Sequence, residues 1–331
     1  MVKDVLIIGA GPVGLFSVFA CGMMGFSCHV IDSLPQAGGQ CAALYPEKYL
    51  YDMPGFPKVL AKDLVSGLMR QAAQFSPTYS FDEWASHFDF KDDHWVVTTS
   101  AKTQYSAHSV VLAAGGGLFR PKRLPLENIE HYEGHSVFYH VHDPQSFRDQ
   151  DIVIAGGGDS ALDWALSLSK IARVTVVHRR AEFRAHPDTI RQFKEAVEAK
   201  TLVFKPGYQL KQLHGQDQTL NQVSIATHGG QSEDLSCQSL LLFFGLAHDL
   251  GPLMGWGLHI DHKGIVVEPT TCLTSQPQMY AVGDIARYPY KRPLVATGCA
   301  EAFQAAQHIY QTRYPERSLH FGHSTSRTDL A

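Results

Sequence analysis

Two glycine-rich segments carry the residues best suited to hold a phosphate. Each begins with a short apolar run, at residues 5–8 and 152–155. In such a motif the first glycine makes a tight turn, the second lets the main chain approach a pyrophosphate, and the third small residue lets helix and strand pack closely. The following helix offers free N–H groups and a positive dipole to the phosphates. The candidate binding residues are Gly9, Gly11, Pro12 and Gly14 in the first motif, and Gly156, Gly158, Asp159 and Ser160 in the second.

An acid in one copy of the motif is replaced by an arginine in the other. Asp32 and Arg179 each stand 23 residues after the first glycine of their motif, at the end of a second apolar run. A carboxylate there accepts hydrogen bonds from a free ribose and would repel a 2′-phosphate. Arg179, with Arg180 and Arg184, offers planar donors for that phosphate. The first motif is therefore predicted to hold FAD or NAD, and the second NADP(H).

Two further segments favour FAD over NAD at the first motif. Gly39 and Gln40 lie in a glycine loop that follows Asp32 closely, and a strand-like run near the C-terminus ends in Gly283 and Asp284. A helix is expected soon after this run. Asp284 can accept a hydrogen bond from a sugar-alcohol hydroxyl, while a helix N-terminus can face the flavin carbonyls. Asp284 alone could equally cap a helix, but beside the glycine motif it favours a flavin.

Taken in order, these motifs resemble those of the thioredoxin-reductase-like flavoproteins, over essentially the whole chain. Residues 43–52, 55–57, 156–165, 178–186 and 323–326 resemble most the ferredoxin/flavodoxin–NADP reductases of the thioredoxin-reductase type. The resemblance implies an α/β fold of two doubly wound dinucleotide-binding modules, with FAD and NADPH as cofactors. It implies neither a catalytic side chain nor a metal, because the flavin carries the chemistry. The further FAD contacts that it implies are Tyr45, Phe119, His323 and Thr325.

The same resemblance implies a domain order and a partner. The FAD-binding domain would comprise residues 1–115 and 246–331, and the NADPH-binding domain would comprise residues 120–243. The acceptor would be ferredoxin or flavodoxin, and the protein would be a homodimer. Thioredoxin is an unsuitable substrate because the six cysteines include no Cys-x-x-Cys pair. Two alternatives stay open: a non-catalytic FAD/NADPH-binding redox sensor and a flavin monooxygenase.

Charge and hydropathy narrow the function classes. A net charge of −4 argues against a general nucleic-acid binder. The apolar stretch at residues 5–31 is interrupted by glycines and a proline, and no basic region or cleavage site precedes it. We therefore expect a cytoplasmic protein without a membrane span. An acidic carrier protein would need a local basic surface, for which the candidates are Arg120, Lys122, Arg123, Lys291 and Arg292.

Overall fold

The computed structural model describes most of the chain, namely residues 2–118, 120–121, 124–141, 143–247, 250–261 and 264–317. Several predicted residues lie outside this range: Phe119, Lys122, Arg123, His323 and Thr325.

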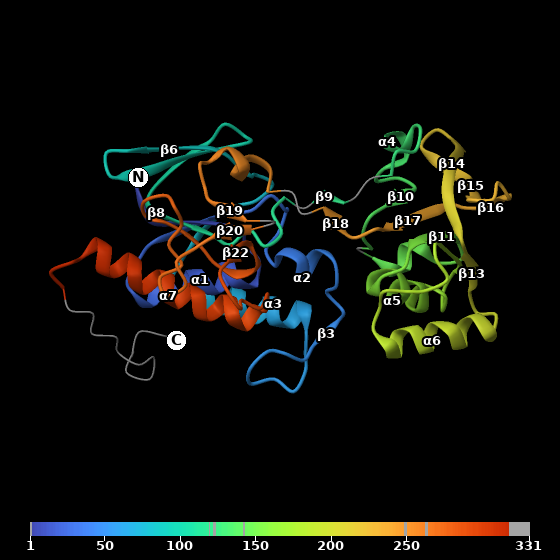
Figure 1. The fold of residues 1–331 in the computed structure, drawn as a ribbon, viewed down its shortest axis with the longest axis horizontal. Helices are drawn as coiled ribbons and strands as arrows, with labels where there is room; N and C mark the ends of the chain where they lie inside the picture. The colour runs from blue at the N-terminus through green and yellow to red at the C-terminus, as the bar shows by residue number, and fades with distance from the viewer. Residues whose placement is uncertain are drawn as a thin grey trace. The chain divides into compact units, whose positions relative to one another are not determined.

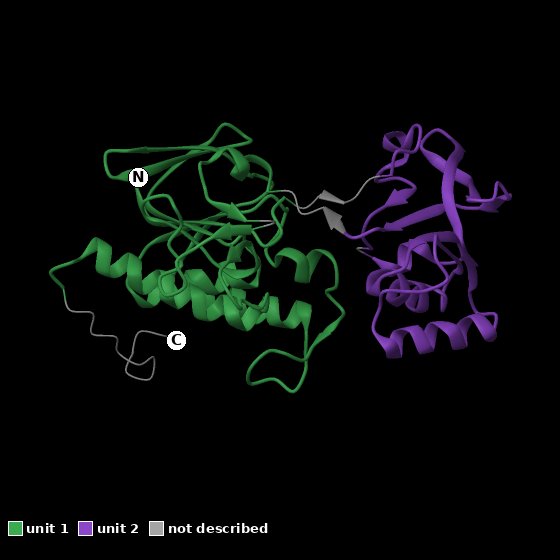
Figure 2. Ribbon diagram, in the orientation of Figure 1, with its two compact units in different colours: residues 1–120, 248–331 green, residues 121–247 purple. Residues whose placement is uncertain are grey.

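The chain divides into two compact units (Figure 2). Unit 1 consists of Met1–Arg120 and His248–Ala331, and unit 2 of Pro121–Ala247. The chain leaves unit 1 at the short strand β9 (Arg120–Pro121) and returns at β18 (Leu246–Ala247). Unit 2 is therefore a continuous segment inserted into a discontinuous one.

The described part of unit 1 is built on a seven-stranded sheet (Figure 1). Six strands lie in the spatial order β5 (Thr78–Ser80), β2 (Cys28–Ile31), β1 (Lys3–Ile8), β8 (Gln104–Leu112), β7 (His94–Thr99) and β6 (Ala85–Lys91). The seventh, β21 (Met279–Ala281), comes from the C-terminal segment and runs parallel to β8. The pairs from β5 to β8 are also parallel, whereas β7 and β6 add an antiparallel hairpin.

Unit 1 has further short elements beside this sheet. Its helices are α1 (Pro12–Met23), α2 (Gly39–Ala43), α3 (Ala61–Ala73), α7 (Val295–Arg313) and the 3₁₀ turns η2 (Gly251–Gly255) and η3 (Gly283–Ile285). Its smaller strands are β3 (Tyr49–Leu50), β4 (Val59–Leu60), β19 (Ile260–Asp261), β20 (Gly264–Val266) and β22 (Ala286–Arg287).

Side chains of β1 alternate between two cores, as the pleat of a strand requires. Val5 and Ile7 belong to a cluster that includes residues of α1 and α7. Leu6 and Ile8 belong to another cluster, formed with β7 and residues 250–286. The strand is apolar on both faces because both are covered, which is typical of a strand within a parallel sheet.

Unit 2 repeats this plan on a smaller scale. Its parallel sheet has the order β10 (Val137–Phe138), β17 (Ser239–Phe243), β11 (Asp151–Gly156), β12 (Arg173–His178) and β13 (Val203–Pro206). Its helices are α4 (Ile129–Tyr132), α5 (Asp159–Leu168), α6 (Pro187–Glu198) and the 3₁₀ turn η1 (Pro144–Phe147). A second, antiparallel sheet is formed by β14 (Tyr208–Gln216), β15 (Thr219–Thr227) and β16 (Ser232–Ser236).

The sequence repeat is also a repeat of topology. In unit 1 the chain runs β1–α1–β2–α3–β5 outward from the glycine turn, and β8 then pairs on the other side of β1. In unit 2 it runs β11–α5–β12–α6–β13, and β17 pairs on the other side of β11. This strand order is that of a dinucleotide-binding half-fold. The longer helices cover one face of each parallel sheet, while strands, irregular segments and the short helices η2 and α4 cover the other.

Candidate functional site

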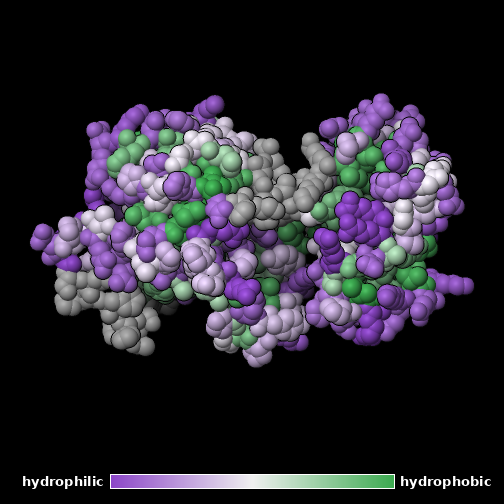
Figure 3. All heavy atoms as spheres, viewed as in Figure 1, coloured by the Kyte–Doolittle hydropathy of each residue, from purple (hydrophilic) through white to green (hydrophobic). Residues whose placement is uncertain are grey.

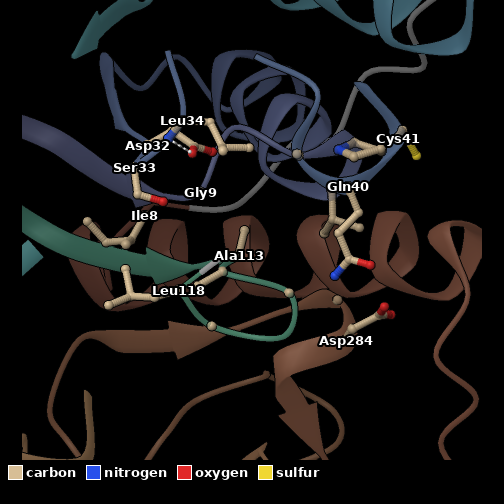
Figure 4. A pocket seen from close by; sticks show the side chains of 18 of the residues that line it. Ile8, Gly9, Asp32, Ser33, Leu34, Gln40, Cys41, Ala113, Leu118 and Asp284 are labelled. Atoms are coloured by element: carbon tan, nitrogen blue, oxygen red, sulfur yellow. Dashed lines mark hydrogen bonds between the residues drawn. The ribbon is translucent and has the colours of Figure 1, made fainter. Parts of the chain in front are cut away.

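The predicted FAD residues converge on one pocket of unit 1, which we call the first pocket (Figure 4). In the close-up, Asp32 lies at one end of the view, and Gln40 and Asp284 lie at the other. Gly14 is also described but is not among the residues that line the pocket. The predicted residues that line the pocket are Gly9, Gly11, Pro12, Asp32, Gly39, Gln40, Tyr45 and Asp284.

Each glycine of the first motif is needed for a different reason. Gly9 has φ +109°, and a Cβ there would lie 2.4 Å from the carbonyl oxygen of Ala113. A Cβ on Gly14 would lie 1.8 Å from the carbonyl oxygen of Gly9, so this glycine lets α1 pack against the turn. A Cβ on Gly11 would meet no heavy atom closer than 3.9 Å. Because Gly11 lines the pocket, the main chain is open to a ligand at the position where a pyrophosphate is expected.

Asp32 is held at the end of β2 by two main-chain donors. Its Oδ2 accepts the N–H of Ala10 at 2.5 Å, and its Oδ1 accepts the N–H of Leu34 at 2.8 Å. Burial raises the pKa of the carboxyl group, and the two hydrogen bonds oppose that rise. The residue is 8% exposed yet lines the pocket, so the remaining acceptor capacity of its carboxylate is available to a ribose hydroxyl.

The segment after β2 returns to the glycine turn. The sequence predicts an open loop here, but the structure has a short helix, α2, beginning at Gly39. The N–H of Gly38 donates to the carbonyl of Ala10 at 2.8 Å. A Cβ on Gly39 would lie 2.9 Å from the Cα of Gly11, so the two turns touch through their main chains. This contact brings Gln40 into the first pocket.

Tyr45 lines the first pocket from the segment after α2. Its hydroxyl accepts a hydrogen bond from the Cys41 thiol, with 3.7 Å between sulfur and oxygen. Burial raises the pKa of both side chains, so the phenol and the thiol are neutral at neutral pH. Tyr45 therefore offers the pocket an uncharged aromatic ring.

The C-terminal part of the first pocket departs from the sequence-based expectation in two ways. The helix expected soon after Asp284 is α7, which begins eleven residues later at Val295, although Val295 also lines the pocket. Lys291, proposed as part of a docking surface, is only 2% exposed in its side chain and is paired with Glu301. The prediction that Lys291 belongs to a docking surface is thus wrong, because its ammonium group is buried. Arg292 is exposed.

Unit 2 contains a second pocket, at the second glycine motif. Of the predicted NADPH residues it is lined by Gly156, Gly158, Arg179, Arg180 and Arg184. A Cβ on Gly158 would meet no heavy atom closer than 3.7 Å, which matches the open position of Gly11 in the first motif. Several other lining residues belong to no motif of the sequence; they come from β14 and from loops, and are Leu124, Glu182, Tyr208 and Gln209.

Asp159 and Ser160 follow the second glycine turn but are not among the residues lining the pocket. The Oδ1 atom of Asp159 instead accepts the main-chain N–H of His186 at 2.8 Å. Nearby, the N–H of Arg184 donates to the carbonyl of Gly157 at 2.8 Å. These two bonds fix the segment that carries Arg184 across the turn, so Asp159 acts on the pocket through that segment.

The second pocket is strongly basic. Arg179, Arg180 and Arg184 are all exposed, and none forms an ion pair with a side chain that the structure describes. Burial and the two neighbouring arginines lower the pKa of His178, which leaves that imidazole neutral at neutral pH. Three guanidinium groups around an open glycine turn suit a ligand with several phosphates.

Residues 3–308 match the family described as pyridine nucleotide-disulphide oxidoreductase. The chain belongs to this family. It is 47% identical to a ferredoxin–NADP reductase of Paramagnetospirillum magneticum over 325 residues, which cover 98% of this chain and 96% of that protein. It is 44% identical to a ferredoxin–NADP reductase of Neorickettsia sennetsu over 331 residues, which cover 100% of this chain and 99% of that protein.

Solved structures support the predicted fold of this pyridine nucleotide-disulphide oxidoreductase. Thioredoxin reductase of Lactococcus lactis has a TM-score of 0.76 at 22% identity, covering 93% of this chain and 98% of that one. Bacillithiol disulfide reductase of Staphylococcus aureus has a TM-score of 0.77 at 19% identity, covering 95% of this chain and 100% of that one. The α/β, thioredoxin-reductase-like fold predicted from the motifs is confirmed.

Despite the family name, the cysteines of this member form no disulfide. Five of the six are buried, Cys299 is half-buried, and all six are free.

Among the described residues no group of three or more histidine, cysteine, aspartate or glutamate side chains could hold a metal ion. No described helix is long and apolar enough to cross a membrane. Hydrophilic residues dominate the face in Figure 3, with apolar residues in separate patches.

Proposed function

We propose that this protein is an FAD-dependent ferredoxin–NADP reductase that passes electrons between NADPH and a small one-electron carrier. One observation carries the proposal: β2 is followed by Asp32 at the first pocket, whereas the equivalent strand β12 is followed by Arg179 at the second. The same topology thus presents a carboxylate to one nucleotide and a guanidinium group to the other. That difference suits FAD in unit 1 and NADPH in unit 2.

FAD fits the chemistry of the first pocket. The open main chain at Gly11 and the N-terminus of α1 would hold the pyrophosphate, and Asp32 would bind the adenosine ribose. Gln40 and Asp284 would bind the flavin end, where Tyr45 would stack on the ring. The FAD-binding domain would then comprise residues 1–115 and 246–331, close to the observed extent of unit 1.

NADPH fits the second pocket, within a domain of residues 120–243. Gly156 and Gly158 would cradle the pyrophosphate, and Arg179, Arg180 and Arg184 would bind the 2′-phosphate. Asp159 contributes by holding the segment that carries Arg184.

The redox chemistry belongs to the cofactors. FAD, when bound, supplies hydride acceptance from NADPH and release of electrons one at a time. The protein side chains bind and orient the two nucleotides, and none is assigned as a general acid or base. No cysteine pair is positioned to carry electrons onward from the flavin, because Cys41 is the only one of the six cysteines that lines the first pocket and the sequence has no Cys-x-x-Cys pair. The proposed acceptor is therefore a one-electron carrier, ferredoxin or flavodoxin, and the names of the similar proteins support ferredoxin.

The remaining proposals rest on the family resemblance. The protein would be a cytoplasmic homodimer, and the C-terminal tail would place His323 and Thr325 against the flavin. Phe119 would also contact FAD. All three residues lie outside the described part of the chain.

NADPH-dependent reduction of cytochrome c, with and without added ferredoxin or flavodoxin, tests the proposed function. The purified protein should be yellow and should release FAD, not FMN, on denaturation. Cytochrome c reduction should accelerate when the carrier is added, and the carrier-dependent part should fall with added salt because acidic carriers dock by charge. Turnover of ferricyanide without any carrier effect would contradict this acceptor class. Binding of both nucleotides without turnover would indicate a sensor, and an oxygenated product would indicate a monooxygenase.

A further inference from the structure

A buried ion pair lies directly behind the Gly283–Asp284 turn. The side chains of Lys291 and Glu301 are each 2% exposed, and Lys291 Nζ donates to Glu301 Oε1. The same oxygen accepts the hydroxyl of Tyr288 at 2.7 Å. The other oxygen, Oε2, accepts the main-chain N–H of Gly283 at 2.7 Å. One carboxylate in α7 therefore gathers donors from the turn and from the segment that follows it.

The turn that Glu301 holds is closely packed. Gly283 has φ +74°, and a Cβ there would lie 3.2 Å from the side chain of Val13 in α1. Gly298 lies one helical turn before Glu301, and a Cβ on it would lie 2.4 Å from Val13 and 3.0 Å from the Cα of Gly283. Small shifts of the turn relative to α7 would therefore produce steric overlap with α1.

Two parts of the first pocket lie next to the Lys291–Glu301 pair, and helix α7 holds both of them in place. Asp284 follows the amide that Glu301 binds, and Leu294 and Val295 at the start of α7 also line the pocket. Burying a carboxylate and an ammonium group carries a large desolvation cost, and an apolar pair of similar volume is often as stable. The pair is therefore poorly explained by stability alone, whereas its hydrogen bond to Gly283 acts on a wall of the pocket.

We propose that Glu301 is a positioning residue for FAD, and that Lys291 cancels its charge. The hydrogen bond from Gly283 to Glu301 sets the place of Asp284 relative to the N-terminus of α7. Lys291 compensates the negative charge of Glu301. Without it, an uncompensated charge would lie near the flavin, whose reduction adds negative charge. This inference rests on the proposed binding of FAD in the first pocket.

Two neutral double variants separate positioning from general stability. Lys291→Met with Glu301→Gln removes both charges but leaves an amide oxygen to accept the Gly283 N–H. Lys291→Met with Glu301→Leu also removes both charges and offers no acceptor. We expect the glutamine pair to bind FAD like the wild type. We expect the leucine pair to bind FAD at least roughly tenfold more weakly, because the turn that carries Asp284 loses the acceptor that holds its Gly283 N–H, while its apoprotein stays folded.

The measurements are the dissociation constant of FAD from the apoprotein, the melting temperature of the apoprotein, and the midpoint potential of the bound flavin. Lys291→Met alone leaves the Glu301 charge uncompensated, so the potential should fall. If reduced FAD then binds about tenfold more weakly relative to oxidised FAD, the two-electron potential falls by about 30 mV. The matched control is the Lys205–Glu233 pair of unit 2, at 2.7 Å, changed to methionine and glutamine. This control should leave both FAD values unchanged.

The outcomes are distinct. A wild-type protein that binds no FAD would contradict the proposed function and, with it, this role of Glu301. If the wild type binds FAD and both double variants bind it equally well, Glu301 has no positioning role. If the leucine pair does not fold, the potential of Lys291→Met decides, and an unchanged potential overturns the proposal.

Discussion

The Oδ2 atom of Asp32 accepts the main-chain N–H of Ala10 at 2.5 Å, so the acid at the end of β2 is bonded to the glycine turn at the end of β1. These are the two elements expected to bind the ribose and the pyrophosphate of one nucleotide. A single carboxylate therefore fixes their relative position before any ligand arrives. Recognition of the ribose and the shape of the turn are coupled through Asp32.

This coupling predicts that replacing Asp32 weakens both the fold and cofactor binding. Hydrogen bonds to a charged group contribute about 1.5–3 kcal/mol each, so Asp32→Ala should raise the dissociation constant of FAD at least roughly tenfold and lower the melting temperature of the apoprotein. Asp32→Asn keeps one acceptor and should have a smaller effect. Fluorescence titration of the apoprotein with FAD measures the first quantity. Asp63→Ala, at an exposed position in α3, is the control, and equal FAD binding by Asp32→Ala would refute the assignment.

The basic second pocket predicts a preference for NADPH over NADH. A charge-assisted contact with the 2′-phosphate contributes about 1.5–3 kcal/mol, or roughly ten- to hundredfold in affinity. Changing Arg179 and Arg180 together to glutamine should therefore raise KM for NADPH by at least that range and leave KM for NADH nearly constant. Arg191→Gln, on α6 and not among the residues lining the pocket, is the control. An equal rise for both coenzymes would show that the arginines do not read the phosphate.

Cys41 provides the strictest test of a mechanism without thiols, since it lines the first pocket. Burial raises the pKa of its thiol, so it is protonated and a weak nucleophile at neutral pH. Cys41→Ser should leave the rate of flavin reduction by NADPH unchanged in rapid-mixing experiments. Neither variant nor wild type should reduce a disulfide substrate at a useful rate. Loss of flavin reduction in Cys41→Ser would mean that the thiol takes part.

The sequence predicts the two motif turns and their strands well because those elements are local. The roles of Gly9, Gly11 and Gly14 follow from spacing alone, and the structure gives each the expected geometry. Sequence spacing does not show where a side chain is bound by a distant segment. It predicts Asp159 at the nucleotide, and the structure adds that its carboxylate holds His186, 27 residues away. It also predicts Lys291 at the surface, whereas the structure buries that side chain against Glu301 of α7.

One signal in the sequence could have revealed that partner. Glu301 stands among small and apolar residues in α7, one helical turn from Gly298 and from Ala305, both of which are buried. An acid on the buried face of a helix needs a cation or several donors. That pattern predicts a buried pair, although it does not identify Lys291 as the partner.

His29 predicts a pH dependence of stability. Its imidazole is bonded to Thr78 at 2.6 Å and to Ser80 at 3.2 Å, and it stacks on Tyr105. Burial, with a smaller contribution from Lys3, lowers its pKa from 6.5 to about 4. Between these pH values the unfolded chain binds a proton that the folded chain does not. The stability due to neutral His29 is therefore complete above pH 6.5 and is lost as pH falls toward 4.

We expect His29→Gln to be less stable than the wild type at pH 7 but to lose less stability on acidification. Melting temperatures of the apoprotein across the interval from pH 7 to pH 4 measure the two slopes. His259→Gln, at an exposed position in unit 1, is the control and should keep the wild-type slope. Parallel curves for His29→Gln and wild type would show that His29 does not set this dependence.

The place of β21 in the sheet has a consequence for biosynthesis. This strand and helix α7 belong to unit 1, yet both are translated after every residue of unit 2. Domains generally fold as units while the chain emerges from the ribosome. Unit 2, which is continuous, can therefore complete its sheet first. At that point β8 still lacks its neighbour β21, and β1 still lacks the apolar residues of α7 that cover one of its faces. The last residues to be translated complete unit 1, where translation began. A chain that stalls before residue 295 would therefore expose one face of the unit 1 sheet, although unit 2 is already folded.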